Sequence, residues 1–370
     1  MPEFEAPSTQ DSTRIDDVRI SAVRPLITPA LLQEWLPAPQ TAIDAVEASR
    51  AALARVLHGG DDRLIVVVGP CSIHDHDEAL EYARRLKAQA DALAGELIVV
   101  MRVYFEKPRT TVGWKGYIND PHHDGSYAIN EGLRLARRLL LDVLALGLPV
   151  GTEFLDLLSP QFISDLVSWG AIGARTTESP SHRQLASGLS CPVGFKNGTG
   201  GDVQIAIDAV KAASQPHHFL AVAKDGRAAI AATTGNPDAH VVLRGGREPN
   251  YDPASLATVS GQMAAAGLPQ RLMVDISHAN SGKQPERQPG VADELARQIE
   301  AGDRRVFGLM VESNLLAGRQ DLTPGAPLVY GRSITDGCID WETSVWVLER
   351  LARAVEARRA AAPSPVLATA

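Results

Sequence analysis

The chain has 370 residues, of which 45% are hydrophobic, so it can bury the core of one large domain or of two small ones. Its formal net charge of -8 offers no general attraction for nucleic acid, and any phosphate binding must depend on a local basic pocket. The three cysteines are scattered, which predicts a cytoplasmic protein without disulfides. The N-terminus carries acidic residues, which argues against a signal peptide, and the apolar runs are too short to span a membrane.

Residues 1–60 are predicted to form an extension ahead of the main domain. Within it, residues 18–23 have the composition of a short strand, and the apolar residues of 41–57 recur with the period of an amphipathic helix. His58, followed by two glycines, gives that helix a stop at its C-terminus.

Residues 61–360 alternate short apolar runs with amphipathic stretches, and a tail of small residues, 361–370, is predicted to be mobile. The runs are continuous and β-branched, as in strands that are buried on both faces of a parallel sheet. Eight such units predict a (β/α)8 TIM barrel, although a doubly wound open sheet gives the same alternation. Two further short runs on either side of Lys224 predict an inserted β-hairpin. The eight predicted strands are 64–70, 97–103, 149–154, 171–176, 192–197, 240–246, 272–277 and 306–313.

Charged residues stand at the C-terminal end of most predicted strands. Any one of them alone would be read as a solvated loop residue, but in a closed barrel these ends meet at one mouth, where barrel active sites lie. Cations that converge there need anions, so the pattern predicts a small substrate with phosphate and carboxylate groups. The residues are Arg102, Lys107, Arg109, Arg175, Lys196 and Arg244, with the acid Glu153 among them.

A thiol, an imidazole and two carboxylates stand at the same strand ends, namely Cys71, His278, Glu312 and Asp336. Their separations are too long for a local metal motif, and outside a barrel they would be a buried thiol, a surface histidine and two solvated acids. At one mouth they predict a site for one divalent metal ion. The mixed donor set suits Mn, Fe, Co or Zn and does not choose among them.

The motifs that contain these residues resemble the type I family of 3-deoxy-D-arabino-heptulosonate 7-phosphate (DAHP) synthases. The most specific is 101-MRVYFEKPRTTVGWKG-116, which stands in order with 69-GPCSIHD-75, 275-DISHANS-281 and 333-SITDGCIDWE-342, and the likeness covers roughly residues 14–359. The resemblance implies a transferase that condenses phosphoenolpyruvate with D-erythrose 4-phosphate and water to give DAHP and phosphate. This reaction is the first step of the shikimate pathway.

The resemblance also implies roles for single residues. The thiol, the imidazole and the two carboxylates would bind the metal. Phosphoenolpyruvate would be held, with Glu153 close by, by Arg102, Lys107, Arg175, Lys196 and Arg244. Lys107, Arg109 and Thr110 would receive erythrose 4-phosphate, with Arg109 on its phosphate group. We hypothesise in addition that Lys107, which lies where it could touch both substrates, protonates the developing alkoxide. The residues expected to act in catalysis are Lys107, Cys71 and His278.

The extension resembles the regulatory arm of family members that are inhibited by aromatic amino acids. The form 15-IDDVRI-20 is closer to the Phe-sensitive kind, while Tyr and Trp stay open as effectors. Asp17 would meet the α-ammonium group and Phe219 would line an aromatic pocket. Alternatively, the arm only packs on a neighbouring subunit, since family members are homodimers or homotetramers built through it. The residues implied at the effector site are Asp16, Asp17, Pro160, Gln161, Ser190 and Phe219.

Three other functions compete with this one. The 3-deoxyoctulosonate 8-phosphate synthases use another aldose phosphate and share the barrel and its cations, but the KPRTTVGWKG tract argues against them. A class II aldolase needs a cluster of histidine ligands that the mouth lacks. A catalytically silent sensor that binds phosphoenolpyruvate would not need an intact set of four metal ligands.

Overall fold

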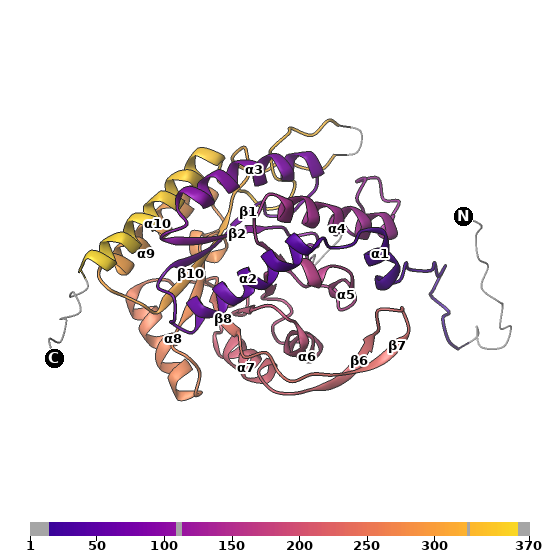
Figure 1. The fold of residues 1–370 in the computed structure, drawn as a ribbon, viewed down its shortest axis with the longest axis horizontal. Coiled ribbons are helices and arrows are strands. Elements are labelled where there is room, and N and C mark those ends of the chain that lie inside the picture. Colours follow the sequence, from indigo (N-terminus) through magenta and orange to yellow (C-terminus); the bar gives the residue numbers. More distant parts are fainter. Residues whose placement is uncertain (1–14, 109–112, 324–325, 362–370) are drawn as a thin grey trace.

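A closed barrel of eight parallel strands dominates the computed structural model, which describes residues 15–108, 113–323 and 326–361 (Figure 1). The strands are β1 (Leu64–Gly69), β2 (Leu97–Arg102), β3 (Val150–Glu153), β4 (Trp169–Ile172), β5 (Val193–Lys196), β8 (Ala239–Leu243), β9 (Leu272–Asp275) and β10 (Val306–Glu312). Their order is β1-β10-β9-β8-β5-β4-β3-β2, and β1 pairs with both β2 and β10. The predicted (β/α)8 barrel is therefore confirmed, and the open sheet is excluded because no edge stays unpaired.

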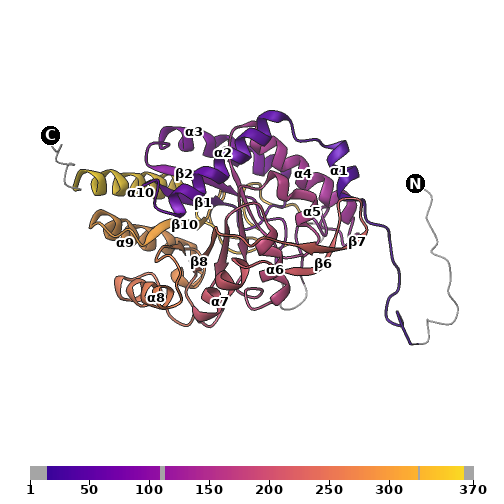
Figure 2. The same cartoon turned by 60° about the horizontal axis from the view of Figure 1, so that its bottom comes forward.

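Helices surround the barrel and return the chain to the start of the next strand (Figures 1 and 2). They are α1 (Pro29–Trp35), α2 (Gln40–Leu57), α3 (His76–Ala92), α4 (Ile129–Ala145), α5 (Pro160–Ile163), α6 (Pro180–Gly188), α7 (Gln204–Ala213), α8 (Pro253–Ala265), α9 (Gln288–Glu300) and α10 (Trp341–Ala361). Local sequence explains several starts. The Asp75 side chain accepts a hydrogen bond from the backbone N–H of Glu78 at α3, and Asp252 caps α8 ahead of Pro253.

The strands divide their apolar side chains between two cores. In β1, Ile65 and Val67 belong to the cluster inside the barrel, whereas Leu64 and Val66 pack beneath the surrounding helices. Both faces of the strand are thus buried, which explains the continuous apolar runs. Leu53 and its neighbours at the end of α2 join the inner cluster and close the N-terminal end of the barrel. The open end is the one at the C-terminal ends of the strands.

The N-terminal arm differs in part from its prediction. The expected helix over 41–57 is confirmed as α2. The strand expected over 18–23 is wrong, because these residues form no strand and Val18, Ile20 and Val23 are exposed. The arm runs away from the barrel, so no neighbouring strand lies alongside to pair with it (Figures 1 and 2).

The inserted hairpin is confirmed as β6 (His218–Val222) and β7 (Ala228–Ala232), which pair in antiparallel fashion. It curves past α6 and reaches α5 and α1 (Figure 1). Lys224 at its tip donates a hydrogen bond from Nζ to the carbonyl oxygen of Gln161, 2.5 Å away. The carbonyl of Lys224 in turn accepts from the N–H of Ala30. The hairpin therefore forms the outer wall of a hollow over α5 and α6.

Candidate active site and effector cavity

The open end of the barrel holds a pocket of about 310 Å³. Its lining contains most of the residues that the strand ends predicted. Arg109 and Thr110 fall outside the described part of the chain, so their prediction stays a prediction. The predicted residues that line the pocket are Arg102, Lys107, Glu153, Arg175, Lys196, Arg244, His278, Glu312 and Asp336.

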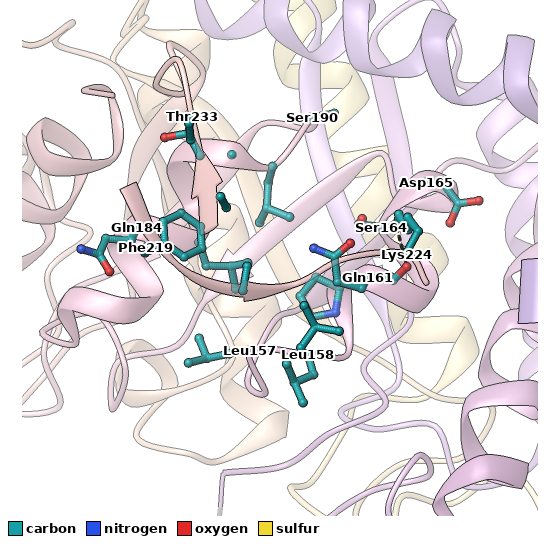
Figure 3. A pocket seen from close by; sticks show the side chains of 18 of the residues that line it. Leu157, Leu158, Gln161, Ser164, Asp165, Gln184, Ser190, Phe219, Lys224 and Thr233 are labelled. Carbon is teal, nitrogen blue, oxygen red and sulfur yellow. Dashed lines mark hydrogen bonds between the residues drawn. The ribbon is translucent and has the colours of Figure 1, made fainter. Parts of the chain in front are cut away.

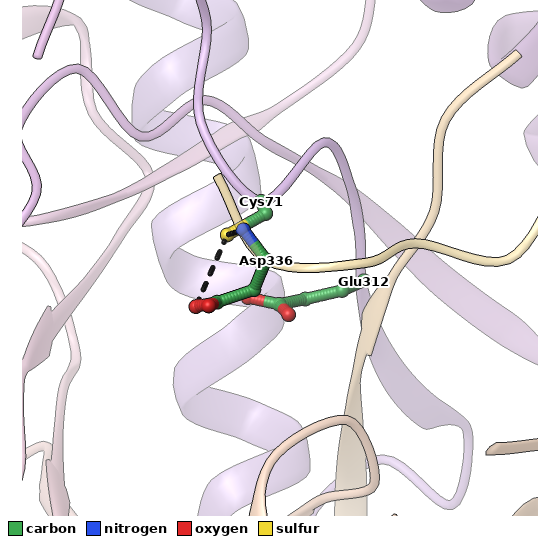
Figure 4. Close-up of side chains that lie close together, drawn as sticks. All are labelled: Cys71, Glu312 and Asp336. Atoms are coloured by element: carbon green, nitrogen blue, oxygen red, sulfur yellow. Dashed lines mark hydrogen bonds between the residues drawn. The ribbon is translucent and has the colours of Figure 1, made fainter. Parts of the chain in front are cut away.

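Three of the four predicted metal ligands form a tight cluster (Figure 4). Cys71 comes just after β1, Glu312 is the last residue of β10, and Asp336 lies in the loop between β10 and α10. Each offers a ligand atom within 4.8 Å of the other two. The fourth, His278, places Nε2 3.8 Å from Glu312 Oε1. One thiol, one imidazole and two carboxylates therefore face one point.

A residue that the sequence analysis missed orients His278. Asp275, the last residue of β9, is fully buried and places Oδ2 2.7 Å from His278 Nδ1 and 3.0 Å from Lys196 Nζ. Burial would raise the pKa of this carboxyl, but His278 and Lys196 hold it well below its usual range. A carboxylate on one imidazole nitrogen fixes the ring so that the other nitrogen serves as ligand. The sequence offered one signal for Asp275, which is its position at the end of an apolar run and two residues before Ser277-His278.

The two cations nearest the cluster are themselves held by it. Arg102 is buried, donates to Glu312 Oε1 at 2.7 Å, and stacks with its guanidinium carbon 3.6 Å from the ring centre of Tyr104. Lys107 places Nζ 3.0 Å from Cys71 Sγ and 3.9 Å from Asp336 Oδ2. Burial opposes the charge of Lys107, but the negative groups around it raise its pKa.

The donor set fits a bound cation. In the protein alone, burial and the nearby Glu312 raise the pKa of the Cys71 thiol to about 11. Lys107 lies against the sulfur and Arg102 against Glu312, so positive charge already compensates the cluster. A divalent ion supplies the same compensation and favours the thiolate. The residues present thus suit a borderline first-row metal.

Two acids on the other side of the pocket stand in unusual surroundings. Glu153, at the end of β3, has Oε1 buried without a hydrogen-bond partner among the described residues. Glu106 is buried beside the pocket loop, and burial followed by the repulsion of Asp156 raises its pKa to about 7. Ser159 Oγ donates to Glu106 Oε2 at 2.9 Å. Ser159 directly precedes α5, but its side chain makes this bond instead of capping the helix.

The pocket also contains polar residues that the sequence analysis did not name. Ser277 and Lys283 come from the loop after β9, Thr199 from the loop after β5, and Arg319 from the loop after β10. Lys283 adopts a positive φ of 59°. Ser277 lies within a motif that had been recognised, whereas Thr199, Lys283 and Arg319 follow their strands at distances that give no regular pattern.

A second cavity, of about 1040 Å³, lies between the hairpin and the helices α2, α5 and α6 (Figure 3). Four of the predicted effector residues, Pro160, Gln161, Ser190 and Phe219, line it. Phe219 and Lys224 project from the hairpin side and Gln161 from α5. Asp16 and Asp17 do not line it, since they lie on the exposed arm that runs away from this chain's body.

The family model described as "DAHP synthetase I family" matches residues 40–349. The chain belongs to this family. Relatives with known activity agree across nearly their whole length. The Phe-sensitive phospho-2-dehydro-3-deoxyheptonate aldolase of Escherichia coli K12 is 56% identical over 344 residues, which cover 93% of this chain and 98% of the relative. The tyrosine-inhibited enzyme of Schizosaccharomyces pombe is 51% identical and covers 95% of this chain and 96% of the relative.

The fold agrees as well. A solved phospho-2-dehydro-3-deoxyheptonate aldolase from Francisella tularensis SCHU S4 superposes with a TM-score of 0.90 at 50% identity, covering 92% of this chain and 99% of that one. These likenesses confirm the type I DAHP synthase family that the motifs indicated, and with it the first step of the shikimate pathway. These relatives differ in effector, one being Phe-sensitive and the other tyrosine-inhibited, so family membership does not choose one. No helix of the described ranges is long and apolar enough to cross a membrane.

Proposed function

We propose that the mouth of the barrel is the metal-dependent active site at which phosphoenolpyruvate and D-erythrose 4-phosphate condense. The observation that carries the proposal is the meeting of the four-donor cluster with seven lysine and arginine side chains at one pocket of about 310 Å³. Two phosphorylated substrates, one of them a carboxylate, bring the negative charge that these side chains need. The chain carries out this cytoplasmic reaction as a homodimer or homotetramer.

The basic residues divide between the two substrates. Arg175 and Arg244 have no acidic partner among the described residues, and both line the pocket. They are thus free to hold phosphoenolpyruvate, together with Arg102 and Lys196, whose positions Glu312 and Asp275 fix. Such charges, placed before the substrate arrives, stabilise the developing charge without reorganisation. Glu153 lies beside this group, and the segment from Lys107 to Thr110 receives erythrose 4-phosphate.

Cys71, His278, Glu312 and Asp336 would hold the metal, which supplies Lewis-acid polarisation of the aldehyde oxygen when bound. Lys107 lies against this cluster with Nζ 3.0 Å from Cys71 Sγ. From there its ammonium group delivers a proton to the oxygen of the former aldehyde as C3 of phosphoenolpyruvate bonds to that carbon. Water adds at C2, and phosphate leaves with cleavage of its C–O bond.

Substrate choice tests the reaction. Phosphate release from phosphoenolpyruvate should require erythrose 4-phosphate and should be at least ~10²-fold slower with arabinose 5-phosphate, because the positions of the two phosphates are fixed. Equal rates with both sugars would favour an octulosonate-type synthase. Binding of phosphoenolpyruvate without turnover on either sugar would favour a silent sensor.

The second cavity is proposed as the effector site for an aromatic amino acid, with Phe ahead of Tyr and Trp. Its support is the group of predicted residues, Pro160, Gln161, Ser190 and Phe219, around a partly apolar hollow. Asp16 and Asp17 would reach such a hollow only on a second copy of the chain. Phe219→Ala should relieve inhibition by the effector and keep the uninhibited rate, since Phe219 does not line the mouth. Unchanged inhibition would place the effector elsewhere.

A further inference from the structure

The N-terminal end of the barrel, opposite the mouth, carries a cavity of about 330 Å³ that the proposed function does not use. Its walls come from the segments just before β1, β9 and β10 and from the last turns of α10. The lining residues are Gly59, Asp61, Asp62, Gln270, Arg271, Arg304, Arg305 and Arg358. Four arginines and two aspartates thus surround one small hollow.

Both aspartates and one of the arginines are already neutralised by close ion pairs. These pairs are Asp61–Arg63, Asp62–Arg359 and Asp303–Arg305, with N–O distances of 2.7, 2.6 and 2.5 Å. The remaining arginines of the lining, Arg271, Arg304 and Arg358, have no carboxylate partner among the residues that the structure describes.

The part of the cavity lined by these three arginines is called the basal arginine pocket. Each of the three side chains has hydrogen-bond donors that are not used within the described part of the chain. Arg271 donates to the carbonyl oxygens of Val56 and Arg304, and Arg358 donates to that of Asp62. The side chain of Arg304 is exposed and makes no hydrogen bond or ion pair within the described ranges. Each guanidinium has five N–H donors, so each of the three keeps donors that make no hydrogen bond within the described ranges.

The three charges also repel one another. Burial and then the charges of Arg358 and Arg304 lower the pKa of Arg271. The pKa of Arg358, a residue only 7% exposed, is lowered by burial and by Arg304, although Asp62 opposes the change. Like charges held together in a partly buried place cost stability unless an anion joins them. The same fork-shaped donors match the oxygens of a phosphate group.

We propose that the basal arginine pocket binds a small multivalent oxyanion, of the phosphate class, at a site separate from the mouth. Its volume of about 330 Å³ is near the lower end for small-molecule sites and leaves room for a phosphate group or a small phosphorylated metabolite. The ligand is either inorganic phosphate or the phosphate group of a small metabolite. If these arginines only capped backbone carbonyls, replacing Arg304 would leave anion binding unchanged, because its side chain caps none among the described residues.

The test compares wild type with Arg304→Gln and with Arg138→Gln. The second variant is the control, since Arg138 on α4 is another exposed arginine that makes no ion pair among the described residues. The melting temperature of each protein is measured as the concentration of inorganic phosphate or glycerol 3-phosphate is increased at constant ionic strength. Saturating phosphoenolpyruvate is present throughout, so that the mouth is filled. Without added anion, Arg304→Gln should melt higher than wild type because repulsion is relieved. With anion, wild type should gain stability and Arg304→Gln at most half as much. Arg138→Gln should follow wild type.

Equilibrium dialysis with labelled phosphate, again with phosphoenolpyruvate present, provides a direct count. Wild type and Arg138→Gln should bind one more phosphate per chain than Arg304→Gln, or bind it at least fivefold more tightly. Tighter binding of glycerol 3-phosphate than of inorganic phosphate would identify a phosphorylated metabolite as the ligand. Tighter binding of inorganic phosphate would identify the free ion as the ligand. Equal binding by all three proteins, or a lower melting temperature of Arg304→Gln without anion, would overturn the proposal.

Discussion

Lys107 and Asp275 show how single residues set up the mouth of the barrel. Lys107 contacts the thiol of the donor cluster directly, while Asp275 acts through His278 and Lys196 from a fully buried position. The first is therefore proposed as a catalytic residue and the second as a positioning residue. The two roles lead to different kinetic consequences.

Replacing Lys107 by Met should lower kcat by ~10² or more, because a proton donor contributes about that much to a rate. The metal content per chain should stay near that of wild type, since Lys107 is not one of the four donors. Lys115→Met, an exposed lysine on the same loop, is the matched control. Turnover near the wild-type value in Lys107→Met would remove the proposed proton transfer.

Asp275→Asn should raise the metal concentration needed for half-maximal activity by ~10–100-fold, the usual effect of losing a carboxylate behind a histidine ligand. Excess Mn²⁺ should restore a large part of the rate. A purely structural aspartate would instead lower the melting temperature and leave the metal requirement unchanged. A metal titration of activity, with melting curves alongside, separates these outcomes.

Glu106 should give the protein a measurable pH dependence. Its pKa rises from 4.5 to about 7 in the fold, so the native state holds a proton that the unfolded state releases. The stabilising contribution is complete below about pH 4.5 and is lost as the pH rises towards about 7, by roughly 3 kcal/mol at most. In Glu106→Gln, stability measured by urea unfolding should fall less between pH 5 and pH 8. An identical fall in both proteins would contradict the shift.

Among the elements, α4 and α8 offer a matched pair of glycines. A Cβ at Gly132 of α4 would overlap the carbonyl oxygen of Ile118, whereas one at Gly261 of α8 meets nothing within 4 Å. Alanine favours a helix by up to ~1 kcal/mol over glycine. Gly261→Ala should therefore stabilise the protein by up to about 1 kcal/mol, and Gly132→Ala should destabilise it. Melting curves that show the same sign for both would contradict the packing of α4.

Most of the barrel could be predicted from the sequence because its strands are buried on both faces and read as continuous apolar runs. The apolar run around Trp169 shows that the exact bounds of a strand are harder to predict than its existence. The strand was predicted over 171–176 but lies at Trp169–Ile172, because Gly173 to Arg175 turn out towards the mouth. The prediction of a strand over residues 18–23 was wrong for another reason. The composition of a segment does not show whether a partner strand lies alongside it.

The candidate site could be predicted from the sequence where its residues lie at the C-terminal ends of the predicted strands. Most residues of the donor cluster and of the cations stand at such an end or in the loop that follows it, and the closed barrel brings them together. Asp275 was missed because an acid at the end of an apolar run does not show which histidine it will face. The basal arginine pocket was missed because Arg271, Arg304 and Arg358 meet only through the packing of α10 beneath the barrel.

At the scale of the whole molecule, the barrel separates three sites. The mouth lies at the C-terminal ends of the strands, the cavity under the hairpin lies at the side, and the basal arginine pocket lies at the N-terminal end. Ser159 links the first two, since it contacts Glu106 near the mouth and precedes α5, whose Gln161 lines the second. The central claim is that the chemistry belongs to the mouth and needs the metal.

The most direct test is to measure metal content per chain and DAHP formation in wild type and Cys71→Ser, before and after EDTA and then with Mn²⁺ added back. The account predicts that wild type binds one ion per chain, loses turnover when it is removed and recovers on addition, while Cys71→Ser binds the ion weakly and turns over slowly. Full turnover after complete removal of the metal would contradict it.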